Sequence, residues 1–528
     1  MTRLINNSIN ILFGAMISFI IALVLFFQNA DYVTKKTFLL PNWLLIVLSV
    51  LVFAVFCICY KLASKKVMGT SIINADRLVL LATVVLFLIQ LYITYNIFFL
   101  SDWDVAQIRK NIFAIHNGDQ RFLTEFGDTY LSVYPNNLLI IFVGVFLLKL
   151  NSVFGVFTGE HLMMCCTVLT CLFNALSCFL VYKSTAYIAN KKVAIVSYII
   201  SLLLFGFSPW SVIYYTDSFG LIFPILSFYL FVKPVKNKYL LLITRFLSVL
   251  VAIAGYFIKP QCVIALIAIV IVAFAKTIGK INLQSIIKFL CLVASCIVCF
   301  VAVNTAVNCQ AAQVGYNIDG EKTLGAPHFF MMGMNNTVGG VYSEEDIIYS
   351  RSFATVDERT DANLKVAFDR INKMGFVGLS KHIAKKLLIA FNDGTFAWGV
   401  DGTFFYEMPQ GEKGKIASVL KSIYYRDGSG YDCFHLFSQF VWLFVLLTML
   451  VSCFKKADAQ NEYKLAIVRL ALIGLILFMA IFEVRARYLY TYAPFFCMLS
   501  ALGASKAYTL IKICLSKLKA IIKIPMLA

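Results

Sequence analysis

Long apolar runs recur along the whole 528-residue sequence, and the longest cover about 18 to 22 residues each. An α-helix needs about 20 predominantly apolar residues to cross the hydrocarbon core of a bilayer. Hydrophobic residues make up 61% of the chain and charged residues 14%, which is more apolar surface than a soluble core can bury. These features predict an all-α polytopic membrane protein. Residues 8–28 follow only Arg3 and lack a small-residue cleavage site, so we expect a retained span rather than a signal peptide.

The apolar runs predict about twelve membrane-spanning helices. Lys61, Lys65, Lys66 and Arg77 lie between the second and third runs, and the positive-inside rule places such a basic link in the cytoplasm. Both termini are then cytoplasmic in a multi-pass protein of the cell membrane. We expect the spans at residues 8–27, 39–60, 78–99, 162–182, 193–208, 218–232, 239–257, 260–276, 287–307, 433–454, 464–482 and 488–512.

The net charge of +19 is the second feature that needs an explanation. The Lys and Arg residues lie mainly in short links between apolar runs, as at Lys233, Lys236 and Lys238. This distribution is typical of positive-inside topology and not of a nucleic-acid-binding surface. We therefore expect the lipid bilayer, and no nucleic acid, as a partner.

Residues 136–150 form an apolar run that is shorter than the roughly 20 residues needed to cross a bilayer. If this run crossed, Lys183, Lys191 and Lys192 would fall outside, together with every later basic link. We therefore predict a non-crossing helix in the first external loop. The predicted organisation is N-terminal transmembrane helices at 1–99, a large external loop at 100–161, transmembrane helices at 162–307, an extracytoplasmic domain at 308–432, and C-terminal transmembrane helices with a basic cytoplasmic tail at 433–528.

The segment 308–432 differs in composition from the rest of the chain, because it is polar and contains no membrane-length apolar run. Residues 361–374, DANLKVAFDRINKM, have the helical spacing of Leu364, Phe368 and Ile371. Residues 394–405, GTFAWGVDGTFF, are typical of turns and short strands. The segment is therefore predicted to be a small mixed α/β extracytoplasmic domain.

Four polar clusters lie at the outer ends of the predicted spans. They are Asp102 and Asp104, followed by Tyr134, Asn136 and Asn137; Tyr215 and Asp217; Lys259; and Glu483, Arg485, Arg487 and Tyr488. Each cluster also has a purely structural interpretation. The acids near residue 102 could be solvated loop residues, Asp217 could be a helix N-cap, Lys259 could snorkel, and the arginines could pair with Glu483 or lipid headgroups. Their predicted convergence on one face favours a function.

Acids and fixed cations together at an outer membrane surface suit the transfer of a sugar from a polyprenyl-phosphate donor. A carboxylate accepts the acceptor's proton as its oxygen attacks the anomeric carbon, and cations hold the departing phosphate. Asp104, or its neighbour Asp102, is the expected base. Arg suits the second role because its guanidinium binds phosphate oxygens bidentately.

Several motifs are absent from the sequence. It has no GxxxxGK, no dinucleotide-binding fingerprint after a strand, and no predicted cytoplasmic domain for a nucleotide sugar, so a lipid-linked donor is expected. HExxH and paired His or Cys ligands are also absent. We expect no required metal or cofactor, although Asp102, Asp104 and Asp217 could share a divalent cation through their carboxylate oxygens.

The four clusters resemble motifs of the GT-C superfamily of integral-membrane glycosyltransferases, which includes protein O-mannosyltransferases and lipid A aminoarabinose transferases. The matching segments are Ser101-Asp102-Trp103-Asp104, Tyr134-Pro135-Asn136-Asn137, Tyr215-Thr216-Asp217 and EVRARYLY at residues 483–490. The resemblance covers residues from about 100 to about 500 and is greatest to a bacterial branch that modifies cell-surface polymers.

This resemblance implies a GT-C-like fold in which Asp104 is the base, with Asp102 as the alternative, and in which Lys259, Arg485 and Arg487 face the donor phosphate. It also implies that residues 136–150 belong to the first external loop. The residues expected to bind substrate are Tyr134, Asn136, Asn137, Tyr215, Asp217, Glu483 and Tyr488. The chain departs from the family in two ways: the loop lacks the Asp-Glu dipeptide of the mannosyltransferases, and two spans precede the usual first one.

The sequence therefore predicts a glycosyltransferase that moves a sugar from a polyprenyl-phosphate-linked donor to a cell-envelope polysaccharide, teichoic acid or other surface acceptor, on the extracytoplasmic face. The alternatives are a flippase or transporter of lipid-linked saccharides, and a polysaccharide polymerase or ligase. A flippase would place its charges in a central cavity near the bilayer midplane. The predicted clusters gather at one surface instead.

Overall fold

The computed structural model describes residues 2–27, 40–50, 72–401, 414–454 and 461–522, and this part of the chain is helical with no β-strand. The longer helices are α1 (Thr2–Phe26), α3 (Ile72–Ile97), α4 (Trp103–Asn117), α7 (Leu138–Phe154), α8 (Met164–Ile188), α9 (Lys191–Ser201), α11 (Ile222–Val232), α12 (Lys238–Tyr256), α13 (Ile264–Gly279), α14 (Leu283–Val314), α17 (Val356–Phe391), α19 (Tyr431–Ser452), α20 (Glu462–Ile481) and α21 (Ala493–Ile522). Shorter helices are α5 (Gln120–Phe122), α6 (Asp128–Val133), α10 (Thr216–Gly220), α15 (Gly325–Gly333), α16 (Glu344–Arg351) and α18 (Lys415–Tyr424).

Within the described residues, 10 helices are long and apolar enough to cross a membrane. Every one of them except Pro135–Phe154 coincides with a predicted span. Half of the predicted span at 39–60, residue 39 and residues 51–60, lies outside the described residues, and residues 42–50 of the other half are helical. The predicted spans at 193–208 and 218–232 correspond to shorter helices: α9 ends at Ser201, where a π-helical segment follows, and Thr216–Val232 is a shorter apolar helix. The number twelve is therefore not confirmed.

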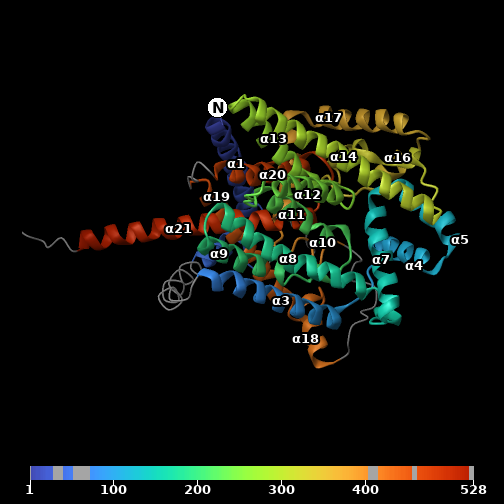
Figure 1. The fold of residues 1–528 in the computed structure, drawn as a ribbon, viewed down its shortest axis with the longest axis horizontal. Coiled ribbons are helices and arrows are strands. Elements are labelled where there is room, and N and C mark those ends of the chain that lie inside the picture. The colour runs from blue at the N-terminus through green and yellow to red at the C-terminus, as the bar shows by residue number, and fades with distance from the viewer. Residues whose placement is uncertain (1, 28–39, 51–71, 402–413, 455–460, 523–528) are drawn as a thin grey trace, which may run out of the picture.

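The helices α8, α9, α19 and α21 pack together in the middle of the molecule (Figure 1). The contact between α19 and α21 is close because Gly503 of α21 faces the backbone of α19. A Cβ atom at Gly503 would lie 1.6 Å from the carbonyl oxygen of Thr448. The two backbones can approach this closely only because position 503 has no side chain.

Replacing Gly503 by alanine is expected to destabilise the packed helices by more than about 3 kcal/mol, because backbone atoms cannot move aside as a flexible side chain would. Thermal unfolding in detergent would measure the loss. Gly14→Ala is the matched control, since its added Cβ would meet only ordinary contacts, the nearest at 3.5 Å from Cys453 Sγ. A Gly503 variant as stable as the Gly14 variant would contradict this close packing.

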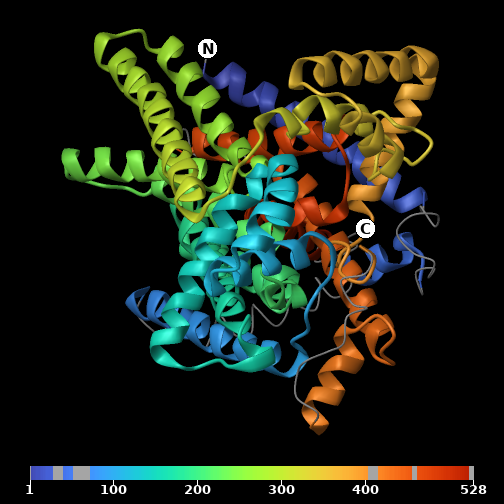
Figure 2. The ribbon, with the colours of Figure 1, turned by 90° about the vertical axis from the view of Figure 1, so that its right-hand side faces the viewer.

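The helix α7 runs in a different direction from α3 and α8, and it lies at the end of the molecule that also carries α4 and α5 (Figures 1 and 2). It packs tightly on α4, since a Cβ at Gly144 would lie 2.3 Å from Ile112 Cδ1. The segment Pro135–Phe154 has the length and composition of a span. That it does not cross therefore stays a prediction.

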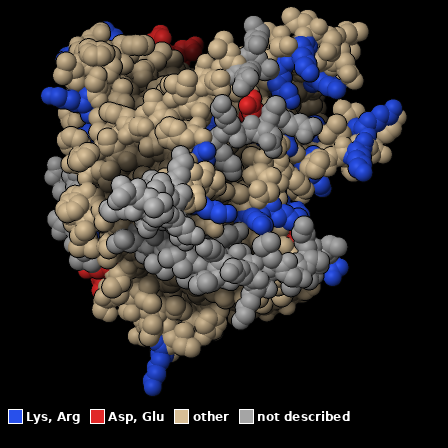
Figure 3. Space-filling model, turned by 90° about the vertical axis from the view of Figure 1, so that its left-hand side faces the viewer, with Lys and Arg blue, Asp and Glu red and all other residues tan. Residues whose placement is uncertain are grey.

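Figure 3 shows the opposite end of the molecule, where Lys and Arg side chains project from several places on the described surface. Lys183 of α8 and Lys191 of α9 both pair with Asp76, at 3.2 and 2.6 Å.

The mixed α/β fold predicted for 308–432 is not confirmed, because the described residues of this segment are helices and turns. Its first residues continue α14 to Val314, and α17 begins with a capping box between Thr355 and Glu358. Gly375 interrupts α17 with a φ of 59°, which only glycine adopts readily. Residues 394–401 form the predicted turns, whereas 402–413 lie outside the described residues.

Candidate active site

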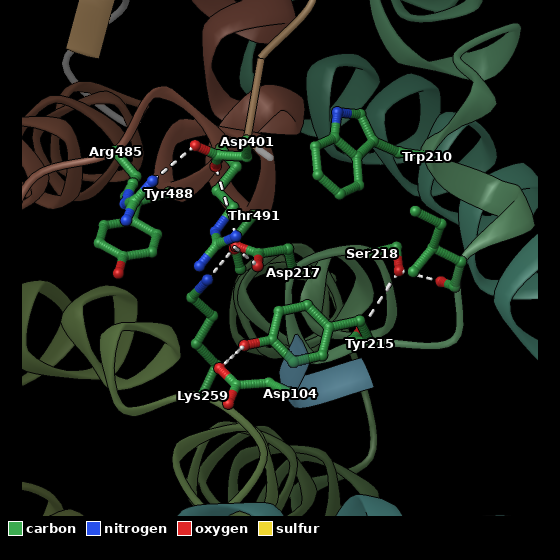
Figure 4. Close-up of polar contacts among 12 residues, drawn as sticks. Asp104, Trp210, Tyr215, Asp217, Ser218, Lys259, Asp401, Arg485, Tyr488 and Thr491 are labelled. Carbon is green, nitrogen blue, oxygen red and sulfur yellow. Dashed lines mark hydrogen bonds and ion pairs between the residues drawn. The ribbon is translucent and has the colours of Figure 1, made fainter. Parts of the chain in front are cut away.

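Asp104 lies in the first turn of α4, where both of its carboxylate oxygens are held by tyrosines. Tyr130 donates its hydroxyl to Oδ1 at 3.1 Å. Tyr215 donates to Oδ2 at 3.0 Å, as Figure 4 shows. The preceding residue, Trp103, has a φ of 58°. A bulky residue in this region costs about 1–3 kcal/mol of backbone strain, a cost often found at functional sites.

The two tyrosines remain protonated donors. Burial, with the nearby Asp104 charge, raises the pKa of Tyr130 and of Tyr215 well above the usual value. The amide of Asn137 donates to the Tyr130 hydroxyl at 2.7 Å, and Asn136 in turn donates to Asn137 at 3.2 Å. Asp104 is half-buried, so it is oriented by these partners and yet remains open to solvent.

Asp102 has a different environment from Asp104. It occupies the N-cap position of α4, but its side chain caps no backbone N–H, and this side chain makes no hydrogen bond or ion pair to a described residue. The two acids lie only two residues apart on one turn. They differ in their side-chain hydrogen-bond partners, which only Asp104 has. Of the two, Asp104 is the carboxylate with fixed geometry.

Tyr134 lies between the Asp104 region and the Glu483 region. Its ring centre is 5.4 Å from that of Tyr130. Burial raises the pKa of Tyr134, and the charges of Asp104 and Glu483 raise it further. The predicted first and fourth clusters therefore meet around this tyrosine.

Asp217 is fully buried and pairs with two cations from distant parts of the chain. Its Oδ1 accepts a hydrogen bond from Lys259 Nζ, and its Oδ2 lies 3.5 Å from Arg487 Nε (Figure 4). The interpretation of Asp217 as a helix N-cap is wrong, because Tyr215 holds the N-cap position of α10. The carboxylate serves as a counter-ion instead.

Lys259 does not snorkel into solvent, since it is only 8% exposed. Its ammonium lies 4.4 Å from the ring centre of Tyr488, in cation–π geometry. Burial lowers the pKa of Lys259, and the Asp217 charge opposes this shift. Gln261 holds the segment after Lys259 against residues 488–491. Its amide donates to the Tyr488 carbonyl at 2.7 Å and to Thr491 Oγ1 at 2.9 Å.

Arg485 and Arg487 share a carboxylate that sequence reasoning missed. Asp401 Oδ1 lies 2.8 Å from an Arg485 nitrogen, and Asp401 Oδ2 lies 3.3 Å from an Arg487 nitrogen. Glu483 accepts from Arg485 Nε at 3.3 Å and from the Tyr488 hydroxyl at 3.0 Å. Arg485 thus pairs with Glu483, as one interpretation expected, whereas Arg487 pairs with Asp217 and Asp401. Together the two arginines join three separate segments.

The turn that carries Asp401 has backbone strain and is held by hydrogen bonds. Phe396 and Ala397 have φ values of 55° and 63°. The buried Asp393 carboxylate stabilises this conformation by accepting from the Thr395 N–H at 2.8 Å, the Thr395 hydroxyl at 2.7 Å and the Ala397 N–H at 2.8 Å. The sequence did contain a signal: Asp401 is the only charged residue in 394–405, and a lone acid in an otherwise apolar turn needs a partner.

The structure therefore brings all four predicted clusters together through side-chain contacts. Three cations face three buried acids in one ion-pair cluster, Lys259, Arg485 and Arg487 with Asp217, Asp401 and Glu483. The Tyr215 ring links this cluster to Asp104, because the Arg487 guanidinium lies 5.7 Å from its centre. Among the described residues, no group of three or more His, Cys, Asp or Glu side chains could hold a metal ion.

Residues 1–508 match a protein family described as "Conserved hypothetical integral membrane protein". No curated protein matches the sequence. Among solved structures, similar chains include the archaeal oligosaccharyltransferase AglB from Archaeoglobus fulgidus in complex with an inhibitory peptide and a dolichol-phosphate (14% identity, TM-score 0.40, 84% of this chain) and an Archaeoglobus fulgidus oligosaccharyltransferase in the apo form (13%, 0.40, 83%). This chain covers 52% of each of them.

Proposed function

The chain belongs to the family of conserved hypothetical integral membrane proteins, and from this premise we propose that it is a membrane glycosyltransferase with a polyprenyl-phosphate-linked sugar donor. The acceptor is a cell-envelope polysaccharide, teichoic acid or other surface molecule, and the site faces the extracytoplasmic side, with both termini in the cytoplasm. The observation that carries this proposal is the arrangement of Asp104, an oriented and partly exposed carboxylate, beside a buried cluster of three cations.

The reaction requires one bond to form and one to break. The acceptor oxygen attacks the anomeric carbon and loses its proton to Asp104, while the bond between the sugar and the phosphate oxygen breaks and polyprenyl phosphate leaves. Tyr130 and Tyr215 keep the Asp104 oxygens in place without protonating them, since both tyrosines remain weak acids. Asp104 can therefore act as the base.

The leaving phosphate needs positive charge that is already in position. Lys259, Arg485 and Arg487 are fixed by their carboxylate partners, and such preorganised groups stabilise developing charge without reorganising at the moment of reaction. Asp217, Asp401 and Glu483 balance these three cations before the donor arrives. A single phosphate diester then adds one negative charge to a locally neutral cluster.

Transfer assays with the purified protein in lipid nanodiscs would test the proposal. We expect release of polyprenyl phosphate from polyprenyl-phosphate sugars and a matching mass increase in an envelope acceptor. Mass spectrometry of envelope glycans from cells with and without the gene would identify the sugar and the acceptor. Movement of the lipid-linked sugar across the bilayer without transfer would overturn the proposal in favour of a flippase.

Replacing Arg485 by alanine is expected to raise the KM for the lipid donor about 10–100-fold and to leave the KM for the acceptor near its original value, because charge-assisted contacts to phosphate contribute about 1.5–3 kcal/mol. Arg485→Lys keeps the charge but loses the bidentate geometry, so an intermediate value is expected. Equal effects on the two substrates would contradict the phosphate-binding role.

A further inference from the structure

The fully buried side chain of Lys386 in α17 makes contacts that the proposed reaction does not use. Its ammonium donates three hydrogen bonds, to the carbonyl oxygens of Gly333 at 2.8 Å, Ala480 at 2.9 Å and Phe482 at 2.7 Å. An ammonium has three N–H donors. All three are used by backbone carbonyls.

These carbonyls belong to the C-terminal ends of two helices. Gly333 is the last residue of α15, Ala480 lies in the last turn of α20, and Phe482 is the C-cap of α20. The last carbonyls of a helix have no partner within the helix, and the helix dipole places partial negative charge there. A lysine between two such ends stabilises both and joins them.

The chain leaves α20 at this point and enters the site. The Glu483 N–H donates to the Phe329 carbonyl at 3.1 Å, and the Val484 N–H donates to the Gly340 carbonyl at 3.0 Å. Arg485 and Arg487 follow directly. The position of both guanidiniums therefore depends on how α20 ends against α15.

Two glycines leave room for the lysine and for the joined helix ends. A Cβ at Gly333 would lie 2.4 Å from the Ile481 carbonyl oxygen, and a Cβ at Gly340 would lie 2.9 Å from Lys386 Cδ. Gly340 also has a φ of 76°, which favours glycine. The local sequence is thus arranged around the buried lysine.

The energetic cost of this arrangement indicates that it has a role. Burial lowers the pKa of Lys386 to about 7, and the Glu483 charge offsets only part of this shift. No carboxylate of the described chain forms an ion pair with Lys386. The neighbouring His382 also contacts the Gly333 carbonyl, at 2.8 Å, whereas Lys385 is exposed.

We propose that Lys386 is a positioning residue that ties the ends of α15 and α20 together and thereby places the Glu483–Arg487 segment in the site. The hydrogen bonds from Lys386 to the two helix ends do not depend on the proposed function. Their effect on the donor phosphate rests on the proposed function.

Hydrogen exchange and transfer assays on Lys386→Met in nanodiscs would test this proposal. The variant keeps much of the side-chain volume but removes all three donors. We expect the Glu483 and Val484 amides to exchange at least 10-fold faster, and the donor KM to rise about 10-fold while the acceptor KM is unchanged. Lys385→Met is the matched control, because it removes the same charge one residue away at an exposed position.

Each outcome decides the proposal. Unchanged exchange of Glu483 and Val484 in Lys386→Met would overturn it, and so would faster exchange with an unaltered donor KM. Faster exchange throughout the chain would show a general loss of folding and would also overturn a positioning role. If the unmodified protein shows no transfer activity, the proposed function is refuted. The exchange rates of the Glu483 and Val484 amides would then test only whether Lys386 holds the two helix ends together.

Discussion

Asp104→Asn is expected to reduce sugar transfer by about two to four orders of magnitude, the range typical of a lost general base. The amide cannot accept the acceptor's proton, yet it has nearly the same shape as the carboxylate. Its oxygen can still accept a hydrogen bond from Tyr130 or Tyr215. The variant should therefore remain folded and inserted in the membrane. Transfer kinetics and thermal unfolding in nanodiscs would measure the two effects separately.

Asp102→Asn is the matched control for this experiment. The two acids are two residues apart in the same turn, but Asp102 makes no side-chain hydrogen bond or ion pair to a described residue. Transfer by this variant should stay within about threefold of the original, since the loss of a solvated acid changes local interactions by less than about 0.5 kcal/mol. An inactive Asp102 variant with an active Asp104 variant would move the base upstream. Full activity of both would remove the catalytic role from this loop.

Asp217→Leu is expected to destabilise the fold by about 3–5 kcal/mol, because it leaves buried cations without their counter-ion. Asp217 is fully buried, and Lys259 is only 8% exposed, so water cannot replace the lost carboxylate. Thermal or denaturant unfolding of the protein in detergent would measure the change. This effect concerns stability and does not depend on whether the protein transfers a sugar.

A second substitution distinguishes the loss of the ion pair from a loss of packing as the cause of the lower stability. The double variant Asp217→Leu with Lys259→Met should recover part of the lost stability, because an apolar pair can replace a buried ion pair at little cost. The exposed pair of Arg121 and Glu125 offers a surface control, at 3.2 Å. Glu125→Leu should cost less than about 1 kcal/mol. An Asp217 variant as mild as this control would contradict the buried cluster.

The choice between Asp102 and Asp104 illustrates the limit of sequence reasoning at this site. Both acids follow an apolar run, and no spacing rule distinguishes them. The distinction depends on Tyr130 and Tyr215, which come from separate segments and converge on Asp104 alone. For Asp217, helix capping was the local structural alternative, and the structure shows a tertiary contact with Lys259 instead.

The amino-acid sequence by itself determined the apolar helices, the placement of basic residues in their links, and which polar segments interrupt them. These properties are local, because hydrophobic length and nearby charge act within one segment. The tertiary structure alone decided that Asp401 joins Arg485 and Arg487, and that Lys386 closes the helix ends beside them. Ion pairs and hydrogen bonds between distant segments depend on the relative packing of whole helices, which no local pattern of residues specifies.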